Sequence, residues 1–166
     1  MMQMVTECEV PVVAAVQGCA HAAGCQLAAS CDVVLAADNA RFATPGVKIG
    51  LFCSTPSVAV TRAVTPKVAA EMLYAARELT AAEALQAGLV SRVVPWREDG
   101  LAGLHREAFQ TCHRIAESPR EVLVAGKSLV RAQGGQELGA AYELASAAME
   151  RGMSLPCARE GVEAFL

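Results

Sequence analysis

The sequence is poor in aromatic residues and in charge, and it contains no long apolar run. Aromatic residues make up 4% of its 166 positions and charged residues 19%, with a formal net charge of −3. This mild acidity, without a cluster of lysine and arginine, excludes a nucleic-acid-binding protein of the usual basic kind. No apolar run reaches the ~18 residues of a membrane-spanning helix, so we expect no membrane insertion.

The cysteines lack the spacing of a metal site or of a disulfide framework. Their number is odd, no CxxC occurs, and they stand at Cys8, Cys19, Cys25, Cys31, Cys53, Cys112 and Cys157. An odd set of cysteines in mostly apolar surroundings is typical of a reducing compartment. The sequence therefore predicts free thiols and no zinc site.

Small and β-branched apolar residues dominate the sequence, and residues 11–32 are the clearest example. Val12 to Val16 predict a buried strand, Gly18 to Gly24 a turn of small residues, and the rest a helix that Asp32 closes. In such a turn a ligand approaches the backbone closely, and the free amides and dipole of the helix start favour negative charge. This geometry suits a phosphate, a carboxylate or a carbonyl oxygen that becomes negative. Close packing alone accounts for the same pattern, so both interpretations stay open.

The remainder of the first half predicts one more buried strand and several short helices. Residues 32–38 form an apolar run bounded by acids, which predicts a strand joined to the first by a right-handed crossover. Residues 39–51 contain proline and glycine and predict an irregular loop over the strand ends, where α/β folds hold ligands. Hydroxyl residues mark three helix starts, namely Ser54-Thr55-Pro56, Thr65-Pro66 before a helix at 67–78, and the capping box Thr80 to Glu83 whose helix Gly88 ends.

The second half of the sequence predicts helices only. Residues 89–94 form the last strand candidate, which Pro95 stops. Amphipathic helices are expected over 101–117, after a capped start at 118–121, over 136–152 and from residue 155. The sequence therefore predicts an α/β part at 1–95 and a helical part at 96–166. Both ends of the sequence break off within a pattern, so we expect a piece of a longer protein.

Residues able to transfer protons are scarce around the predicted turn. His21 lies within it, but a lone histidine is more often structural. Gln26 offers an amide, which orients a ligand but does not act as a base at neutral pH, and Gly46 offers only backbone. Cys53 precedes a helix start, where a thiol pKa is lowered, yet no histidine lies nearby in sequence to serve as its base. A buried thiol is the favoured interpretation of Cys53.

Two segments together resemble the enoyl-CoA hydratase/isomerase superfamily, also called the crotonase family. They are PVVAAVQGCAHAAGCQLAASCDVVLAADNARFATPGVKIGLF and LTAAEALQAGLVSRVVP. The resemblance implies an α/β fold, a crotonase-like ββα spiral present only in its C-terminal turns, followed by helices that build trimers, often paired into hexamers. It implies lipid metabolism and an acyl-CoA ligand, with coenzyme A as part of that ligand and no separate cofactor. A mitochondrial location follows for a eukaryotic source and a cytoplasmic one for a bacterial source.

The resemblance also implies roles for individual residues. Ala23 would supply one of two backbone N–H groups to the thioester carbonyl oxygen. The family's two acid/base glutamates fall at Gln26 and Gly46, so neither carboxylate is present. The residues expected to line the substrate are Ala22, Gly24, Gln26, Gly46, Cys53 and Ser54.

Three functional hypotheses follow from this pattern. The first is an acyl-CoA-binding relative of enoyl-CoA hydratases with weak or altered hydratase activity, because each missing acid or base removes ~10² to 10⁴ in rate. The second is a non-catalytic acyl-CoA-binding or assembly subunit that associates through its helices. The third is a truncated product without a function of its own.

Overall fold

The chain alternates short strands with helices up to residue 94, and helices follow from residue 100. This computed structural model describes residues 1–97 and 99–165, so positions 98 and 166 of the predicted helical part lie outside it. The chain divides into two compact units. The first comprises Met1–Cys8 and Val12–His113, and the second comprises Glu9–Pro11 and Arg114–Leu166.

Most elements of the first unit are shorter than ten residues. The strands are β1 (Val13–Val16), β2 (Cys19–His21), β3 (Val33–Ala37), β4 (Arg41–Ala43), β5 (Leu79–Thr80) and β6 (Arg92–Val94). The helices between and around them are α1 (Met2–Glu7), α2 (Ala23–Ser30), the 3₁₀ turn η1 (Pro45–Ile49), α3 (Ser54–Ala63), α4 (Pro66–Tyr74) and α5 (Ala81–Ala87). The longer helices that follow are α6 (Gly100–Ala116), α7 (Arg120–Gln133), α8 (Leu138–Met153) and α9 (Pro156–Phe165). None of the described helices is long and apolar enough to cross a membrane.

The strands form two small sheets. The runs at 12–16, 32–38 and 89–94 contain strands, as predicted, and these strands form a parallel sheet with the order β1-β3-β6, in which β3 is central. The second sheet has the order β2-β4-β5, with β2 parallel and β5 antiparallel to β4. Alanine and valine dominate the central strand because a parallel strand is buried on both faces.

Two sequence-based expectations were wrong in detail. Residues 19–21 were expected within a turn but form β2, which pairs with β4 inside the segment 39–51 that was expected to be irregular. The remainder of that segment contains η1. The strands were missed because three residues are too few to show an alternation of apolar and polar side chains. Their hydrogen bonds are also made with a strand about twenty residues away in the sequence.

The helix starts were placed correctly, but most of the expected side-chain caps are absent. α3 begins at Ser54 with Cys53 as its N-cap residue, and the Ser54 hydroxyl donates to the carbonyl of Phe52 at 3.3 Å. Thr65 precedes α4 without a side-chain capping bond. α4 also ends at Tyr74, four residues before the predicted end. Proline in the first turn therefore marks these starts more reliably than the hydroxyls do.

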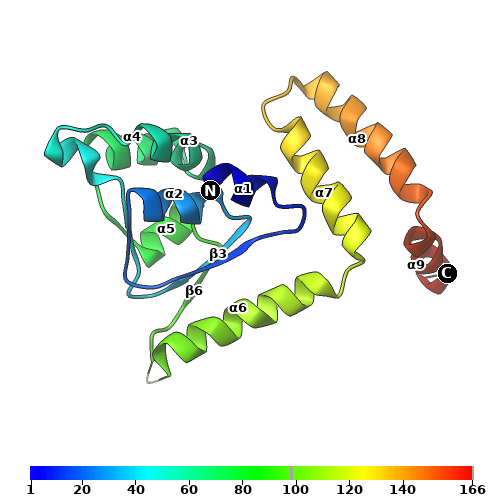
Figure 1. Cartoon of the computed structure of the whole chain (residues 1–166), viewed down its shortest axis with the longest axis horizontal. Coiled ribbons are helices and arrows are strands. Elements are labelled where there is room, and N and C mark those ends of the chain that lie inside the picture. Colours follow the sequence, from blue (N-terminus) through cyan, green and yellow to red (C-terminus); the bar gives the residue numbers. More distant parts are fainter. Residues whose placement is uncertain (98, 166) are drawn as a thin grey trace. The chain divides into compact units, whose positions relative to one another are not determined.

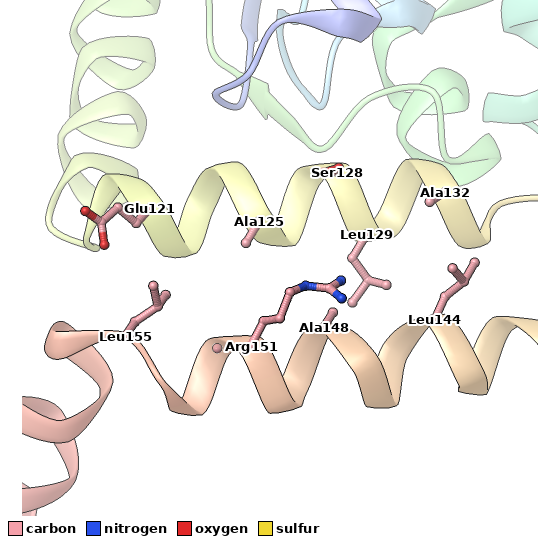
Figure 2. Close-up of a pocket in the computed structure, with 10 residues that line it drawn as sticks. Glu121, Ala125, Ser128, Leu129, Ala132, Leu144, Ala148, Arg151 and Leu155 are labelled. Carbon is pink, nitrogen blue, oxygen red and sulfur yellow. The ribbon is translucent and has the colours of Figure 1, made fainter.

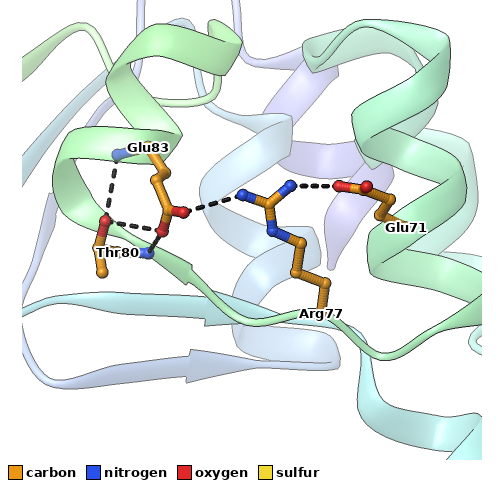
Figure 3. Close-up of polar contacts among 4 residues, drawn as sticks. All are labelled: Glu71, Arg77, Thr80 and Glu83. Carbon is orange, nitrogen blue, oxygen red and sulfur yellow. Dashed lines mark hydrogen bonds and ion pairs between the residues drawn. The ribbon is translucent and has the colours of Figure 1, made fainter.

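The predicted capping box of α5 is confirmed. The Thr80 hydroxyl accepts from the amide of Glu83 at 3.2 Å, and the Glu83 carboxylate accepts from the Thr80 amide at 2.8 Å. Arg77 lies between Glu83 and Glu71 and pairs with both (Figure 3). The bonds from the amide and hydroxyl of Thr80, followed by the bond from Arg77, lower the pKa of Glu83 to about 2. Gly88, with φ 91°, ends the helix in the left-handed conformation, as expected.

The core of the first unit is built from small residues around a few large ones. Phe42, Met72 and Leu79 are fully buried in the main cluster, which also contains Cys25 and Ala28 of α2. α2 and α3 pack side by side within this unit (Figure 1). Small side chains allow this close packing and so fix the position of the turn that begins α2.

The second unit consists of packed helices and the short segment 9–11. α7 packs along α8, and α9 contacts α8 (Figure 1). The Lys127 ammonium donates to the carbonyl of Val10 at 3.0 Å, and Arg120 pairs with Glu9 at 2.9 Å. The helices expected at 101–117 and 136–152 and from residue 155 are confirmed to within three residues at each end.

Candidate functional site

The turn between β2 and α2 has an unusual backbone. Ala22, the N-cap residue of α2, has φ 46° and ψ −109°, a conformation in which an alanine is strained. Its amide donates to the carbonyl of Ala43 in β4 at 2.9 Å, and its carbonyl accepts the first bond of α2 from the Gln26 amide at 2.9 Å. Both bonds hold the strained residue in place, because they fix the peptide groups on either side of it.

This backbone leaves a set of donors at the start of α2. The first helical bond begins at Gln26, so the amides of Ala23, Gly24 and Cys25 have no partner within the helix. Ala23 and Gly24 are both exposed. The start of α2 therefore combines exposed residues, amides without a partner in the helix and the positive end of a helix dipole, which together suit a ligand oxygen.

Gln26 lies one turn along α2 and faces a groove in the first unit. The groove has a volume of about 540 Å³ and lies between α1, α2 and α3. Its lining combines apolar and polar side chains, namely Met2, Gln3, Thr6, Gln26, Ala29, Ser30, Thr55, Val58, Ala59 and Arg62. Of the residues that we expected to line a substrate, Gln26 is the one in this groove. The α1 residues were missed because no sequence signal connects that helix to the turn.

Gly46 and Cys53 form a second group of the expected site residues. The Gly46 amide donates to the Cys53 thiol at 3.3 Å, and the Leu51 amide donates to the Gly46 carbonyl at 3.0 Å. Cys53 is buried in the same cluster as Cys25. Burial, and secondarily the nearby Cys53 thiol, raises the pKa of Cys25 to about 12, so Cys25 stays a neutral thiol.

His21 pairs with a residue that the sequence did not suggest. Its Nε2 lies 2.8 Å from the Glu78 carboxylate, and both side chains are more than a third exposed. The sheet brings the two residues near each other. His21 in β2 lies opposite Ala43 of β4, and Glu78 directly precedes β5, which pairs with the other edge of β4. Such an exposed pair has a structural explanation, because it bridges two strands across a small residue.

The described part of the chain contains no cluster of three potential metal-ligating side chains. The expected site residues thus fall into separate groups: Ala23 and Gly24 begin α2, Gln26 lines the groove, and Gly46 and Cys53 are joined in the loop before α3. Free amides at a helix start suit a ligand oxygen that carries negative charge. Neither position 26 nor position 46 carries a carboxylate.

Comparison with known proteins identifies the family and the fold of this chain. The sequence profile described as Enoyl-CoA hydratase/isomerase matches residues 1–166. The chain belongs to the enoyl-CoA hydratase/isomerase family and has the crotonase fold.

Individual relatives resemble the chain along almost its whole length. It is 48% identical over 165 residues to the rat mitochondrial enoyl-CoA hydratase domain-containing protein 3, a match that covers 99% of this chain and 53% of the relative. The crystal structure of the human protein of that name superposes with a TM-score of 0.91 at 48% identity, covering 99% of this chain and 63% of the other. An enoyl-CoA hydratase structure from Mycobacterium smegmatis gives a TM-score of 0.93 at 41% identity, covering 99% and 62%. The chain thus spans about half the length of the curated relatives it matches.

Proposed function

We propose that this chain is part of an acyl-CoA-binding protein of lipid metabolism whose hydratase activity is weak or altered. One observation carries the proposal: the exposed amides at Ala23 and Gly24 begin α2, whereas position 26 carries an amide and position 46 no side chain. The membership of the family supports a coenzyme A thioester as the ligand. The names of the most similar relatives support a mitochondrial location if the source is eukaryotic.

The proposed mechanism places the thioester carbonyl oxygen at the start of α2. The Ala23 amide donates to that oxygen and stabilises the negative charge that it gains when the neighbouring carbon is deprotonated or attacked. Gln26 donates or accepts a hydrogen bond beside the acyl group but does not take up a proton. Each missing acid or base removes ~10² to 10⁴ in rate, so binding persists while addition of water to an enoyl thioester becomes slow.

The test is calorimetric titration of the chain with butyryl-CoA and with free coenzyme A. Ala23 is the first residue of α2, where proline is tolerated, so Ala23→Pro removes the N–H group. Proline also restricts the backbone of the preceding Ala22, so circular dichroism has to show that the variant is folded. We expect butyryl-CoA to bind more tightly than free coenzyme A. We expect Ala23→Pro to weaken that binding about 3- to 10-fold, the value of one hydrogen bond.

Ala23→Gly is the matched control, because it changes the same residue and keeps the N–H group. It should bind butyryl-CoA as the parent chain does. Equal affinities for butyryl-CoA and free coenzyme A would contradict the proposal, as would an Ala23→Pro variant that is folded and binds with unchanged affinity.

A second candidate role, assembly with other subunits, is favoured by the helices of the second unit. Large apolar side chains on α7, α8 and α9 are exposed, for example Tyr142 at 68%, Met149 at 72% and Met153 at 61%. α7 and α8 also border cavities of about 330 and 490 Å³. In the first of these, the Arg151 side chain lies between the two helices beside Leu129, and Leu144 and Leu155 lie towards opposite ends of the cavity (Figure 2). Apolar faces of this kind are typical of subunit interfaces.

We propose, from membership of the family together with these exposed faces, that the protein forms a homotrimer, or a hexamer of paired trimers, through these helices. Light scattering coupled to size-exclusion chromatography measures the mass directly. A mass three or six times that of the chain is the expected result. Tyr142→Glu or Met149→Glu should lower the mass, since a buried unpaired charge opposes association. A monomer at micromolar concentration would contradict this assembly.

A further inference from the structure

The loop of residues 46–53 is closed on itself at Gly46. The Leu51 amide returns to donate to the Gly46 carbonyl at 3.0 Å, and the Gly46 amide donates to the Cys53 thiol at 3.3 Å. Both backbone groups of Gly46 are therefore bonded within the loop. Cys53 is buried and also precedes α3, whose start fixes its backbone.

An aromatic pair connects this loop to α4. The ring of Phe52 stacks on the ring of Tyr74, with 5.9 Å between centroids and 22° between planes. Tyr74 ends α4, and α4 contacts η1. Offset stacking of this kind holds two rings in register. The closed form of the loop is thus specified by residues within it and by the end of one neighbouring helix.

No space remains for a side chain at position 46. A Cβ atom there would lie 2.5 Å from the Leu51 carbonyl oxygen and 2.8 Å from the Cys53 sulfur. Real Cβ contacts essentially never fall below 3.0 Å. A Cβ at Gly24, in the first turn of α2, would meet nothing nearer than 4.0 Å. Gly46 is therefore required by its neighbours, whereas Gly24 is not.

We propose that the Cys53 thiol and the Leu51 carbonyl together fill the space of a side chain at position 46, so that this loop excludes an acid or base there. The site then receives an acyl thioester at the Ala23 amide but holds no acid or base at position 46. This proposal rests on the proposed function. Its consequence is an asymmetry between the two positions, because Gln26 faces an open groove and has room for a carboxylate, whereas position 46 does not.

The packing half of the proposal is tested by thermal denaturation of Gly46→Ala and of its control Gly24→Ala. We expect Gly46→Ala to lower the midpoint by roughly 3–10 °C, the range for overpacking in a chain of this size. Gly24→Ala should not lower it, since alanine favours a helix. In a background that carries Cys53→Ala, Gly46→Ala should lower the midpoint by less than it does in the parent chain, because the Cys53 sulfur no longer meets the new methyl group. Equal midpoints for Gly46→Ala and Gly24→Ala would overturn the proposal.

The functional half is tested with Gln26→Glu, Gly46→Glu and the double variant. We expect Gln26→Glu to fold as the parent does. We expect Gly46→Glu to hydrate crotonyl-CoA no faster than the parent chain, and the double variant to hydrate it no faster than Gln26→Glu. A folded double variant that hydrates crotonyl-CoA ~100-fold faster than Gln26→Glu would overturn the proposal. If the parent chain binds no butyryl-CoA, the proposed function is refuted. The packing around Gly46 is decided separately, by the midpoints of Gly46→Ala and Gly24→Ala.

Discussion

Replacement of Ala22 by glycine should stabilise this protein, although most substitutions with glycine destabilise. Ala22 has φ 46° and ψ −109°, and its two neighbouring peptide groups are bonded to Ala43 and Gln26. An alanine held in such a sparsely populated conformation carries about 1–3 kcal/mol of strain. Glycine adopts the conformation freely, so Ala22→Gly releases this strain without changing a hydrogen bond.

Two smaller terms oppose the gain in stability from Ala22→Gly. Glycine makes the unfolded chain more flexible, which costs about 0.4–1 kcal/mol. Ala22 is half-buried against the main core cluster, so loss of its methyl group costs about 0.4 kcal/mol. With strain near the middle of its range, the net effect is about 1 kcal/mol of added stability, or a midpoint roughly 2–4 °C higher.

Urea and thermal denaturation of Ala22→Gly measure this difference, with Ala29→Gly as the control. Ala29 lies within α2 and is also half-buried, but its backbone is helical, so glycine there should cost about 1 kcal/mol. The two substitutions should therefore shift the midpoint in opposite directions. A loss for Ala22→Gly as large as that for Ala29→Gly would refute the strain at the turn.

Three further outcomes follow from the polar contacts and the thiols. Thr80→Ala should lower stability by about 1 kcal/mol in urea titration, whereas Thr65→Ala, which loses no capping bond, should have a smaller effect. The pKa of Glu83 in the folded chain, about 2, lies below its ordinary value. Its contribution to the free energy of unfolding is therefore complete above about pH 4.5 and is lost as the pH falls towards 2, and Glu83→Gln should flatten that part of the stability–pH curve. Iodoacetamide at pH 8 should modify exposed Cys19 but not Cys25, whose pKa is about 12, until urea unfolds the chain; rapid native labelling of Cys25 would contradict its burial.

The central strands could be predicted because their information is local. The run at 32–38 is apolar throughout and bounded by acids, and it forms β3 at the centre of its sheet. The capping box of α5 could also be predicted, since Thr80 and Glu83 bond to each other within one turn. The small strands β2 and β4 could not, because three residues show no pattern and their pairing joins segments about twenty residues apart.

Part of the candidate site could also be predicted, because some of its features depend on neighbouring residues alone. The small residues before α2 marked a place where the backbone is accessible, and the sequence alone determined that positions 26 and 46 carry no carboxylate. The strain at Ala22, the contact between Gly46 and the Cys53 thiol, and the groove beside Gln26 depend on the tertiary structure. A glycine in the sequence marks an absent side chain, but only the folded loop shows that its neighbours fill the space where a side chain would be.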